Sequence, residues 1–247
     1  MTAAMDSEGI AERLSRVRRL VGDAARRSGR EGQVRLIAVS KGHPPEALRE
    51  AYAAGQRDFG ENYVQELERK AEALADLPEL RFHLIGHLQR NKAKVVVRRI
   101  SAVHSLDSLE LAAELDRRAQ GVDIPLERRV FGDDPRLPVL IEVNIANEPQ
   151  KSGVAPAELG ALLEAVERAR SLRLAGLMCV PPLSDDPRAS VPHFEALARL
   201  RDAHGGAKRL RELSMGMTAD YAEAVGCGAS VVRIGTAIFG ARPPREA

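Results

Sequence analysis

The chain has 247 residues, of which 44% are hydrophobic and 29% are charged, and its formal net charge is +2. This near-neutral balance gives no overall field that would attract nucleic acid or an anionic membrane surface. No apolar run approaches the about 20 residues that a membrane-spanning helix needs, and the acidic N-terminal stretch does not resemble a signal peptide. Cys179 and Cys227 predict neither a disulfide framework nor a metal site. We therefore expect a cytoplasmic, reduced globular protein.

Short apolar runs alternate with helical patterns along the chain. Residues 10–28 carry apolar side chains at helical spacing and predict an amphipathic N-terminal helix. The runs assigned to strands are 35–40, 57–62, 82–86, 102–106, 138–144, 173–180, 212–215 and 231–235. The helices predicted between them are 45–54, 63–75, 89–98, 108–120, 156–170, 191–203 and 219–226, and a short helix fits after the eighth strand.

Regular alternation of strands and helices indicates a parallel sheet, and eight such units in this length indicate a closed α/β (β/α)8 TIM barrel. A doubly wound open sheet is the alternative. Residues 1–247 are expected to form a single domain with its additional helix within 1–30. Residues 121–137 interrupt the alternation and are interpreted as a surface excursion, and the Pro-rich tail 241–247 is expected to fray.

Small and hydroxylic residues follow the last two predicted strands. In this fold the active site lies at the C-terminal ends of the strands, and the loops after the seventh and eighth strands often bind phosphate. Those loops contain Ser214 with Gly216, and Gly235 with Thr236. Glycine lets backbone N–H groups approach an oxyanion closely, and hydroxyl groups add donors. The pattern favours a phosphate site over ordinary turn and capping chemistry, which is the alternative.

Lys41 directly follows the first predicted strand, where a buried run opens into a loop. A lysine that is partly desolvated and lies near another cation has a lowered pKa and can act as a nucleophile toward a carbonyl. The alternative is a side chain that extends to the rim of the barrel or pairs with Glu61. Position alone does not decide between the two interpretations.

Arg233 lies in the middle of the eighth predicted strand, between two apolar neighbours. Because side chains alternate along a strand, Arg233 points to the opposite face from those neighbours. An arginine inside a barrel needs an acceptor, because burying an unpaired charge is costly. The acceptor is either a ligand atom or a buried carboxylate, with Glu61 and Glu142 as candidates.

These three features match one ligand. Pyridoxal 5′-phosphate presents a phosphate, an aldehyde that reacts with amines, and a flat ring with an acceptor nitrogen. Lys41 would take the aldehyde as a Schiff base, and Arg233 would face the pyridine nitrogen. The phosphate would be held by Ser214, Gly235 and Thr236.

The chain also resembles the pyridoxal phosphate homeostasis (YggS-like) proteins, which are relatives of the N-terminal barrel domain of bacterial alanine racemase. The resemblance covers nearly the whole chain in order. The matching pieces are AVSKGHP (38–44), FGENYVQE (59–66), FHLIGHLQRNK (82–92), VHSLDS (103–108), VNIANEPQKSG (143–153), GLMCVPP (176–182), LSMGMTADYAEAV (213–225) and VRIGTAIFG (232–240). It implies a TIM barrel that carries the cofactor on Lys41. It also implies the contacts given above for the phosphate and the ring nitrogen, and Asn62 belongs to the family's cofactor-pocket motif.

An arginine at the ring nitrogen bears on catalysis. Enzymes that need a strong electron sink place a carboxylate there, whereas arginine cannot accept the proton. Racemisation also needs a second acid/base on the opposite face of the cofactor, which a second domain supplies in the racemases. Few residues follow Arg233, and none of Tyr52, Tyr63 and Tyr221 can be given that role from the sequence.

We therefore expect a cofactor-binding protein of intracellular vitamin B6 homeostasis that carries pyridoxal phosphate to apo-enzymes, with at most weak racemase-type activity. No catalytic residue and no metal ligand is assigned. The protein is expected to be a monomer with no nucleic-acid or membrane partner. The alternatives are a pyridoxal-phosphate-dependent amino-acid racemase and a cofactor-free aldolase that forms a Schiff base through Lys41.

Overall fold

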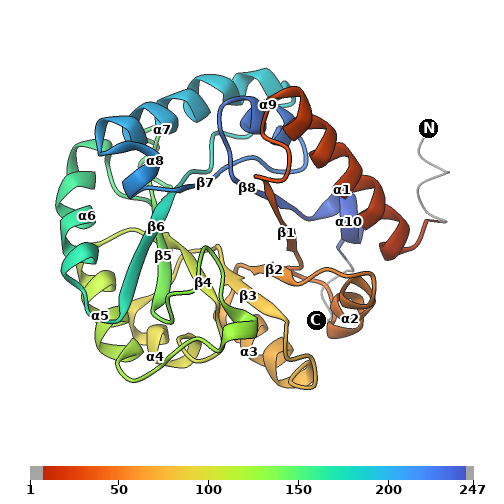
Figure 1. Ribbon diagram of the computed structural model, residues 1–247, viewed down its shortest axis with the longest axis horizontal. Helices are drawn as coiled ribbons and strands as arrows, with labels where there is room; N and C mark the ends of the chain where they lie inside the picture. Colours follow the sequence, from red (N-terminus) through yellow and green to blue (C-terminus); the bar gives the residue numbers. More distant parts are fainter. Residues whose placement is uncertain (1–7, 243–247) are drawn as a thin grey trace.

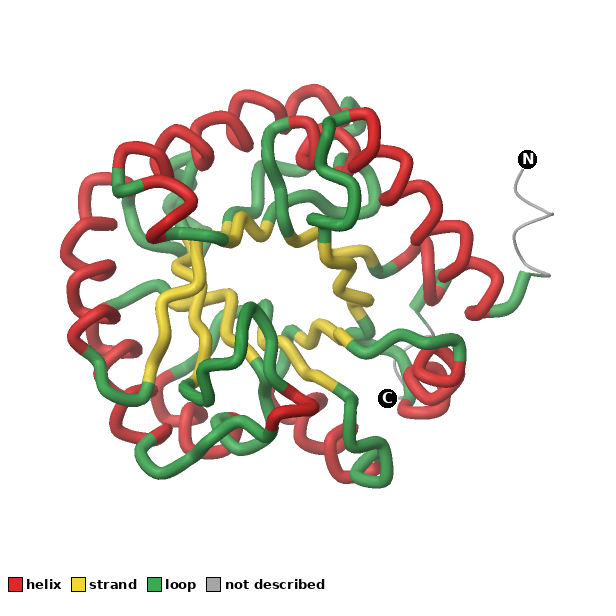
Figure 2. Tube along the Cα trace, viewed as in Figure 1, coloured by secondary structure: helices red, strands yellow, loops and turns green. Residues whose placement is uncertain are grey.

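The computed structural model describes residues 8–242 and contains a closed ring of parallel strands inside a ring of helices (Figures 1 and 2). Each strand pairs with the next one along the chain, and β8 pairs with β1 to close the barrel. This closure confirms the predicted (β/α)8 barrel over the open-sheet alternative. The strands are β1 (Arg35–Val39), β2 (Asp58–Glu61), β3 (Arg81–Leu84), β4 (Ala102–Leu106), β5 (Leu137–Glu142), β6 (Leu172–Met178), β7 (Glu212–Ser214) and β8 (Val231–Ile234).

Most of the predicted helices are present with ends shifted by a few residues. They are α1 (Ile10–Arg27), α2 (Pro45–Ala53), α3 (Val64–Ala73), α4 (Ala93–Val96), α5 (Leu109–Ala119), α6 (Leu159–Arg168), α7 (Val191–Ala203), α9 (Tyr221–Gly226) and α10 (Thr236–Phe239). The single helix predicted over 89–98 is instead a 3-10 turn (Arg90–Lys92) followed by the short α4. A further short helix, α8 (Gly206–Arg209), was not predicted. It begins after Gly205, whose φ of 104° lets the chain turn sharply out of α7.

The N-terminal helix α1 packs across the outside of the barrel against α2, α9 and α10 (Figure 1). Its buried face carries Leu14, Val17, Val21 and Ala24, which recur at helical spacing. Residues 1–7 and 243–247 lie outside the described part of the chain. The single domain over 1–247 and the frayed tail at 241–247 therefore stay predictions. No helix of the described residues combines the length and the apolar character that a membrane span needs.

The apolar core has two parts. A large cluster fills the space between the strands and the surrounding helices, as the alternation of side chains along each strand requires. A smaller cluster lies inside the ring of strands and includes Ile37, Leu140, Met178 and Val231. The rest of the barrel interior is polar, because several inward positions carry ionisable or hydroxylic side chains. This polar interior leads directly to the candidate site.

The excursion between α5 and β5 differs in part from the prediction. Leu126 is 67% exposed, as expected for a surface segment, but Val130 and Phe131 are buried inside the lower, N-terminal end of the barrel. The Phe131 ring packs against His83 and His104, with ring centroids 6.1 and 6.0 Å away. The segment therefore covers the N-terminal end of the barrel interior.

Replacing Phe131 with alanine tests this role. Removing a buried aromatic ring leaves a cavity, so we expect Phe131→Ala to lower the free energy of unfolding by about 3 kcal/mol. The exposed Leu126 in the same segment is the matched control, and Leu126→Ala should change that free energy by less than about 0.5 kcal/mol. Urea denaturation measures both. Equal small effects would show that Phe131 does not close the barrel.

Candidate functional site

Lys41 lies in the turn between β1 and α2, at the C-terminal end of the barrel, and its side chain is half-buried. The turn is fixed on both sides of this residue. The carbonyl of Ser40 accepts a hydrogen bond from Lys70 Nζ at 2.6 Å, and the N–H of Gly42 donates to Glu66 Oε1 at 2.6 Å. Both partners come from α3, so this helix determines where the Lys41 backbone lies.

The buried residue Lys70 is the centre of this arrangement. Its side chain is fully buried, and its Nζ lies 2.6 Å from Glu61 Oε1 at the end of β2 and 2.8 Å from Glu66 Oε1. The Ser40 hydroxyl also donates to Glu61 Oε1 at 2.6 Å. One ammonium and two carboxylates thus join β1, β2 and α3 beneath Lys41. Sequence reasoning missed Lys70, because a lysine four residues after a glutamate on a helix usually forms a surface pair.

The proposed pairing of Lys41 with Glu61 is wrong, because Glu61 pairs with Lys70 instead. Within residues 8–242 Lys41 forms no ion pair at all. Burial lowers the pKa of Lys41, and the positive charges of Arg242 and Arg233 lower it further. These are the conditions under which a lysine amine is neutral often enough to attack a carbonyl.

Arg233 lies inside the barrel with only 4% of its surface exposed. Its Nη1 donates to Ser214 Oγ at 2.7 Å, and its Nη2 donates to the carbonyl of Cys179 at 2.9 Å. The predicted alternative of a buried ion pair is wrong, because Glu61 pairs with Lys70 and Glu142 accepts a hydrogen bond from Ser152. The guanidinium is therefore held by uncharged acceptors and keeps its full charge inside the barrel.

A chain of hydrogen bonds extends from Arg233 across the barrel interior. Ser214 Oγ lies 3.0 Å from His104 Nδ1, His104 Nε2 lies 3.0 Å from His83 Nδ1, and His83 Nε2 lies 3.0 Å from Asp58 Oδ1. All these residues are buried. The chain links the paired strands β7 and β8 to the paired strands β2, β3 and β4 on the other side of the barrel.

Asp58 ends this chain at the N-terminal side of the barrel. Its carboxylate lies 2.9 Å from Arg35 Nη1 and 3.0 Å from Arg81 Nε. Burial opposes ionisation, but the hydrogen bond from His83 and the two arginines hold the pKa of Asp58 well below its usual range. Asp58 is therefore a carboxylate, and it can only accept hydrogen bonds.

Because Asp58 can only accept, it determines which atom is the donor in every hydrogen bond of the chain. Burial lowers the pKa of His83 and of His104, so both imidazoles are neutral and each has one donor and one acceptor nitrogen. His83 donates to Asp58, His104 donates to His83, and the Ser214 hydroxyl donates to His104. The Ser214 oxygen then accepts from Arg233. The Ser214 hydroxyl thus has both roles occupied within the protein, and its contact with a phosphate stays a prediction.

Gly235 and Thr236 lie where β8 passes into α10, beside the end of β1. Neither of their backbone N–H groups donates to a protein acceptor within residues 8–242. A Cβ atom at Gly235 would lie 3.1 Å from the carbonyl of Val39, two residues before Lys41. The two free N–H groups and the exposed Thr236 hydroxyl form a donor set that suits an oxyanion.

Asn62 follows β2 and lies in a separate part of the same barrel end. It lines a cavity of about 330 Å³ together with Gly86, Glu142 and Lys151, and this cavity is not lined by Lys41 or Arg233. The Oδ1 atom of Asn62 is buried and has no hydrogen-bond partner in the described structure. The structure therefore brings Lys41, Arg233 and Gly235 together at β1 and β8, with Asn62 further round the ring.

This donor set fits pyridoxal phosphate. An amine without an ion pair, a buried guanidinium and two free backbone N–H groups match an aldehyde, a ring nitrogen and a phosphate. The roles of Lys41, Asn62, Ser214, Arg233, Gly235 and Thr236 toward that group stay predictions.

Comparisons with known proteins give the family. Residues 13–243 match the family described as alanine racemase, N-terminal domain. The chain is 45% identical to the pyridoxal phosphate homeostasis protein of Pseudomonas aeruginosa, over 94% of this chain and 96% of that protein. The chain belongs to the pyridoxal phosphate homeostasis protein family. The protein of that name from Aquifex aeolicus is 41% identical, over 94% of this chain and 97% of its own.

Solved structures agree with this membership. PipY of Synechococcus elongatus, in a structure with pyridoxal phosphate bound, is 39% identical with a TM-score of 0.75, and the match covers 94% of this chain and all of that chain. Alanine racemase from Corynebacterium glutamicum is 19% identical with a TM-score of 0.63. The match covers 95% of this chain and 60% of the racemase, and it shows that the two share the barrel fold.

Replacing Lys70 with methionine tests the anchor under Lys41. Removing one member of a buried ion cluster leaves Glu61 charged and unpaired, so we expect Lys70→Met to lower the free energy of unfolding by about 3 kcal/mol at pH 8. The exposed Lys94 is the control, and Lys94→Met should cost less than about 0.5 kcal/mol.

The loss should depend on pH in a known direction. Burial already raises the pKa of Glu61, and without the ammonium of Lys70 that pKa rises further. A carboxyl whose folded pKa is raised binds its proton more readily in the folded state, so lower pH favours folding. The deficit of the variant should therefore shrink between pH 8 and pH 5. A deficit that is constant or grows on acidification would contradict the assignment.

Replacing Ser214 with alanine breaks the interior chain between Arg233 and His104. Two buried polar groups then lose their partner, and we expect the free energy of unfolding to fall by about 2 kcal/mol. The exposed Ser28, which lacks a side-chain hydrogen bond in the described structure, is the matched control. Thermal and urea unfolding measure both variants, and similar small losses would mean that the chain does not stabilise the interior.

Proposed function

We propose that this protein binds pyridoxal 5′-phosphate between the ends of β1 and β8 and acts in intracellular vitamin B6 homeostasis as a cofactor carrier. The single observation that carries the proposal is the state of Lys41. This amine is half-buried, lacks an ion pair within residues 8–242, and lies near the charges of Arg233 and Arg242. The likeness to PipY, whose structure was solved with pyridoxal phosphate, supports the same choice of ligand.

Each residue of the site has a definite task in this proposal. The bound group supplies an aldehyde, a phosphate and an aromatic ring whose nitrogen can accept a hydrogen bond. Lys41 holds the aldehyde carbon covalently as a Schiff base, and its lowered pKa provides the neutral amine that this requires. The N–H groups of Gly235 and Thr236 and the Thr236 hydroxyl bind the phosphate.

Arg233 limits the chemistry of the bound ring. It donates toward the ring nitrogen and cannot take a proton from it, so the ring is kept as a weaker electron sink than beside a carboxylate. Ser214 and the Cys179 carbonyl hold the guanidinium in one orientation. This arrangement favours storage of the cofactor over turnover.

The tyrosines do not supply an evident second acid/base. The ring of Tyr52 is covered by the guanidinium of Arg57, with 3.9 Å between the guanidinium carbon and the ring centroid. Burial raises the pKa of Tyr221, so its hydroxyl is less readily ionised, and Tyr63 is 54% exposed. We therefore assign no catalytic residue and propose a monomeric cytoplasmic carrier that gives its cofactor to apo-enzymes. The racemase and aldolase alternatives are outcomes of the test below.

Spectroscopy and trapping test the proposal. Purified protein mixed with pyridoxal phosphate should turn yellow, and borohydride should fix the label on Lys41, as mapped by mass spectrometry. Lys41→Ala should lose at least about 90% of the fixed label, because borohydride fixes the cofactor only by reducing its Schiff base with a lysine to a stable amine. Lys94→Ala, at an exposed helical position, should keep it.

Three results would contradict the carrier. The first is a colourless protein that borohydride traps only with an added sugar phosphate, which would indicate an aldolase. The second is rapid exchange of the α-hydrogen of alanine with turnover, which would indicate a racemase. The third is cofactor transfer to an apo-enzyme that is no faster from the loaded protein than from free cofactor at the same concentration.

A further inference from the structure

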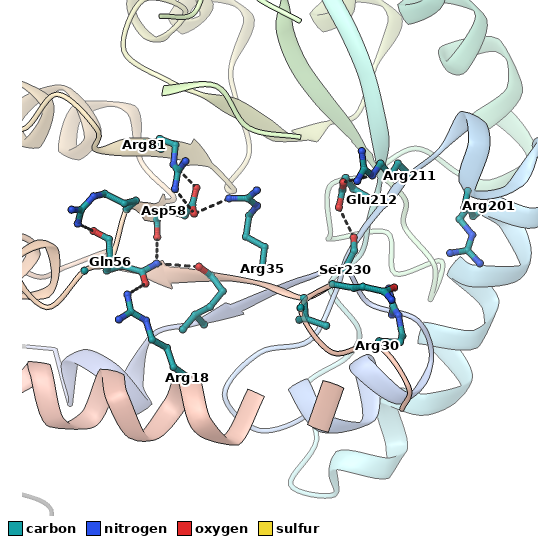
Figure 3. Close-up of a pocket in the computed structure, with 17 residues that line it drawn as sticks. Arg18, Arg30, Arg35, Gln56, Asp58, Arg81, Arg201, Arg211, Glu212 and Ser230 are labelled. Atoms are coloured by element: carbon teal, nitrogen blue, oxygen red, sulfur yellow. Dashed lines mark hydrogen bonds and ion pairs between the residues drawn. The ribbon is translucent and has the colours of Figure 1, made fainter. Parts of the chain in front are cut away.

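A second cavity lies at the opposite, N-terminal end of the barrel and is rich in arginine (Figure 3). We call it the basal cavity. It has a volume of about 800 Å³ and is bounded by α1, the starts of the strands and the loops that lead into them. Its charged lining consists of seven arginines and two carboxylates, namely Arg18, Arg30, Arg35, Arg57, Arg81, Arg201, Arg211, Asp58 and Glu212. The proposed function uses none of these arginines to contact the cofactor.

The carboxylates of the cavity leave much of its positive charge unbalanced. Asp58 is shared by Arg35 and Arg81, and Glu212 lies 3.7 Å from Arg211 and accepts a hydrogen bond from Ser230. Arg57 and Arg201 pair with acids outside the cavity lining. Two further arginines, Arg18 and Arg30, form no ion pair within residues 8–242.

Arg18 and Arg30 are held in place by uncharged groups. Arg18 donates to the carbonyl of Ala54 at 2.8 Å and to Gln56 Oε1 at 3.0 Å. The amide of Gln56 is fixed in turn, because its Nε2 donates to the carbonyl of Asp58 at 2.7 Å. Arg30 donates to the carbonyl of Ala229 at 2.7 Å. These contacts orient the two guanidinium groups without neutralising them, and several of their N–H groups are left over.

The unbalanced charge acts on the arginines themselves. Burial lowers the pKa of Arg18, and the neighbouring Arg57 lowers it further. Burial lowers the pKa of Arg30 as well, and Arg201 adds to this effect. Like charges that are half-buried and fixed in position repel one another, and an anion between them would relieve that repulsion.

We propose that the basal cavity binds a small anion that carries two or more phosphate groups. Guanidinium groups bind phosphate through paired N–H donors, and fixed guanidinium groups lose little freedom when they do so. The arginines are spread around the cavity, so an anion with two or more phosphate groups would contact and balance more of them than a single phosphate would. The volume lies within the range of sites for nucleotide-sized ligands. Inorganic polyphosphates and nucleoside polyphosphates share this chemistry, and the concave shape favours a small molecule over a polymer.

Calorimetric titration of the full chain with inorganic tripolyphosphate tests the proposal. The protein is first loaded with pyridoxal phosphate, so that the phosphate donors of Gly235 and Thr236 are occupied. Ionic strength is held constant throughout the titration. We expect saturable binding at one site, and we expect Arg18→Gln and Arg30→Gln each to weaken it about tenfold, because each removes charge-assisted hydrogen bonds.

Two further variants test whether the effect is specific to the basal cavity. Arg49 on α2 pairs with Asp76 at 2.6 Å and does not line the cavity, so Arg49→Gln removes the same charge elsewhere and should change the Kd less than about twofold. Arg211, with a side chain that is 77% exposed, is the variant that is safest for folding, and Arg211→Gln should also weaken binding. All variants should keep the borohydride-fixed label on Lys41, which separates this site from the cofactor site.

The outcomes are distinct. Equal weakening in Arg49→Gln would mean diffuse attraction and would overturn the proposal, as would no heat from millimolar tripolyphosphate and ATP. Tighter binding of a single-stranded RNA than of tripolyphosphate would also overturn it. Binding of ATP that is tighter than that of tripolyphosphate, and sensitive to the same arginines, would support the proposal and identify a nucleoside polyphosphate. Equal binding would support it and show that the phosphates alone are recognised.

Discussion

The buried ammonium of Lys70 is the interaction on which the geometry of the site depends. It holds the carbonyl of Ser40, the carboxylate of Glu61 and that of Glu66 within hydrogen-bond distance. A buried charge of this kind is tolerated only when all its donors are used, and here three acceptors from three elements use them. Those acceptors include the carbonyl of Ser40, and Glu66 also accepts a hydrogen bond from the N–H of Gly42. The position of the Lys41 turn is therefore determined by a second lysine that is fully buried.

The same cluster explains why Lys41 has no ion pair among the described residues. Glu61 at the end of β2 is the carboxylate with which a lysine at the end of β1 would be expected to pair, but its Oε1 already binds Lys70 and Ser40. An amine whose natural partner is taken, and which lies near two guanidinium groups, is left with a lowered pKa. In this barrel, therefore, one lysine holds the turn in place, and the other has the lowered pKa on which the proposed function depends.

The fold was predictable because its signal is local. Apolar runs alternate with helical patterns, and strand ends such as Lys41 and Gly235 meet because parallel strands place their C-terminal ends on one side. What escaped prediction depends on contacts between distant segments. His83 and His104 meet because of the register of β3 against β4. Phe131 reaches the N-terminal end of the barrel interior from a loop that has no periodic signal. The uncharged partners of Arg233 were not predicted for the same reason, because a serine hydroxyl and a backbone carbonyl carry no distinctive sequence signal.

The hydrogen-bond chain from Arg233 to Asp58 has a consequence for the electrical state of the barrel. All its members donate in the same direction, from Arg233 toward Asp58. Neither imidazole ring can therefore flip without breaking the hydrogen bonds on both of its sides. The chain of hydrogen bonds therefore behaves as a fixed dipole that crosses the barrel interior. The electrostatic potential around Arg233 is then set by these fixed hydrogen bonds rather than by the pH of the solvent. A binding site built on such a fixed dipole offers its ligand the same surroundings across the pH range in which Asp58 stays ionised and both imidazoles stay neutral.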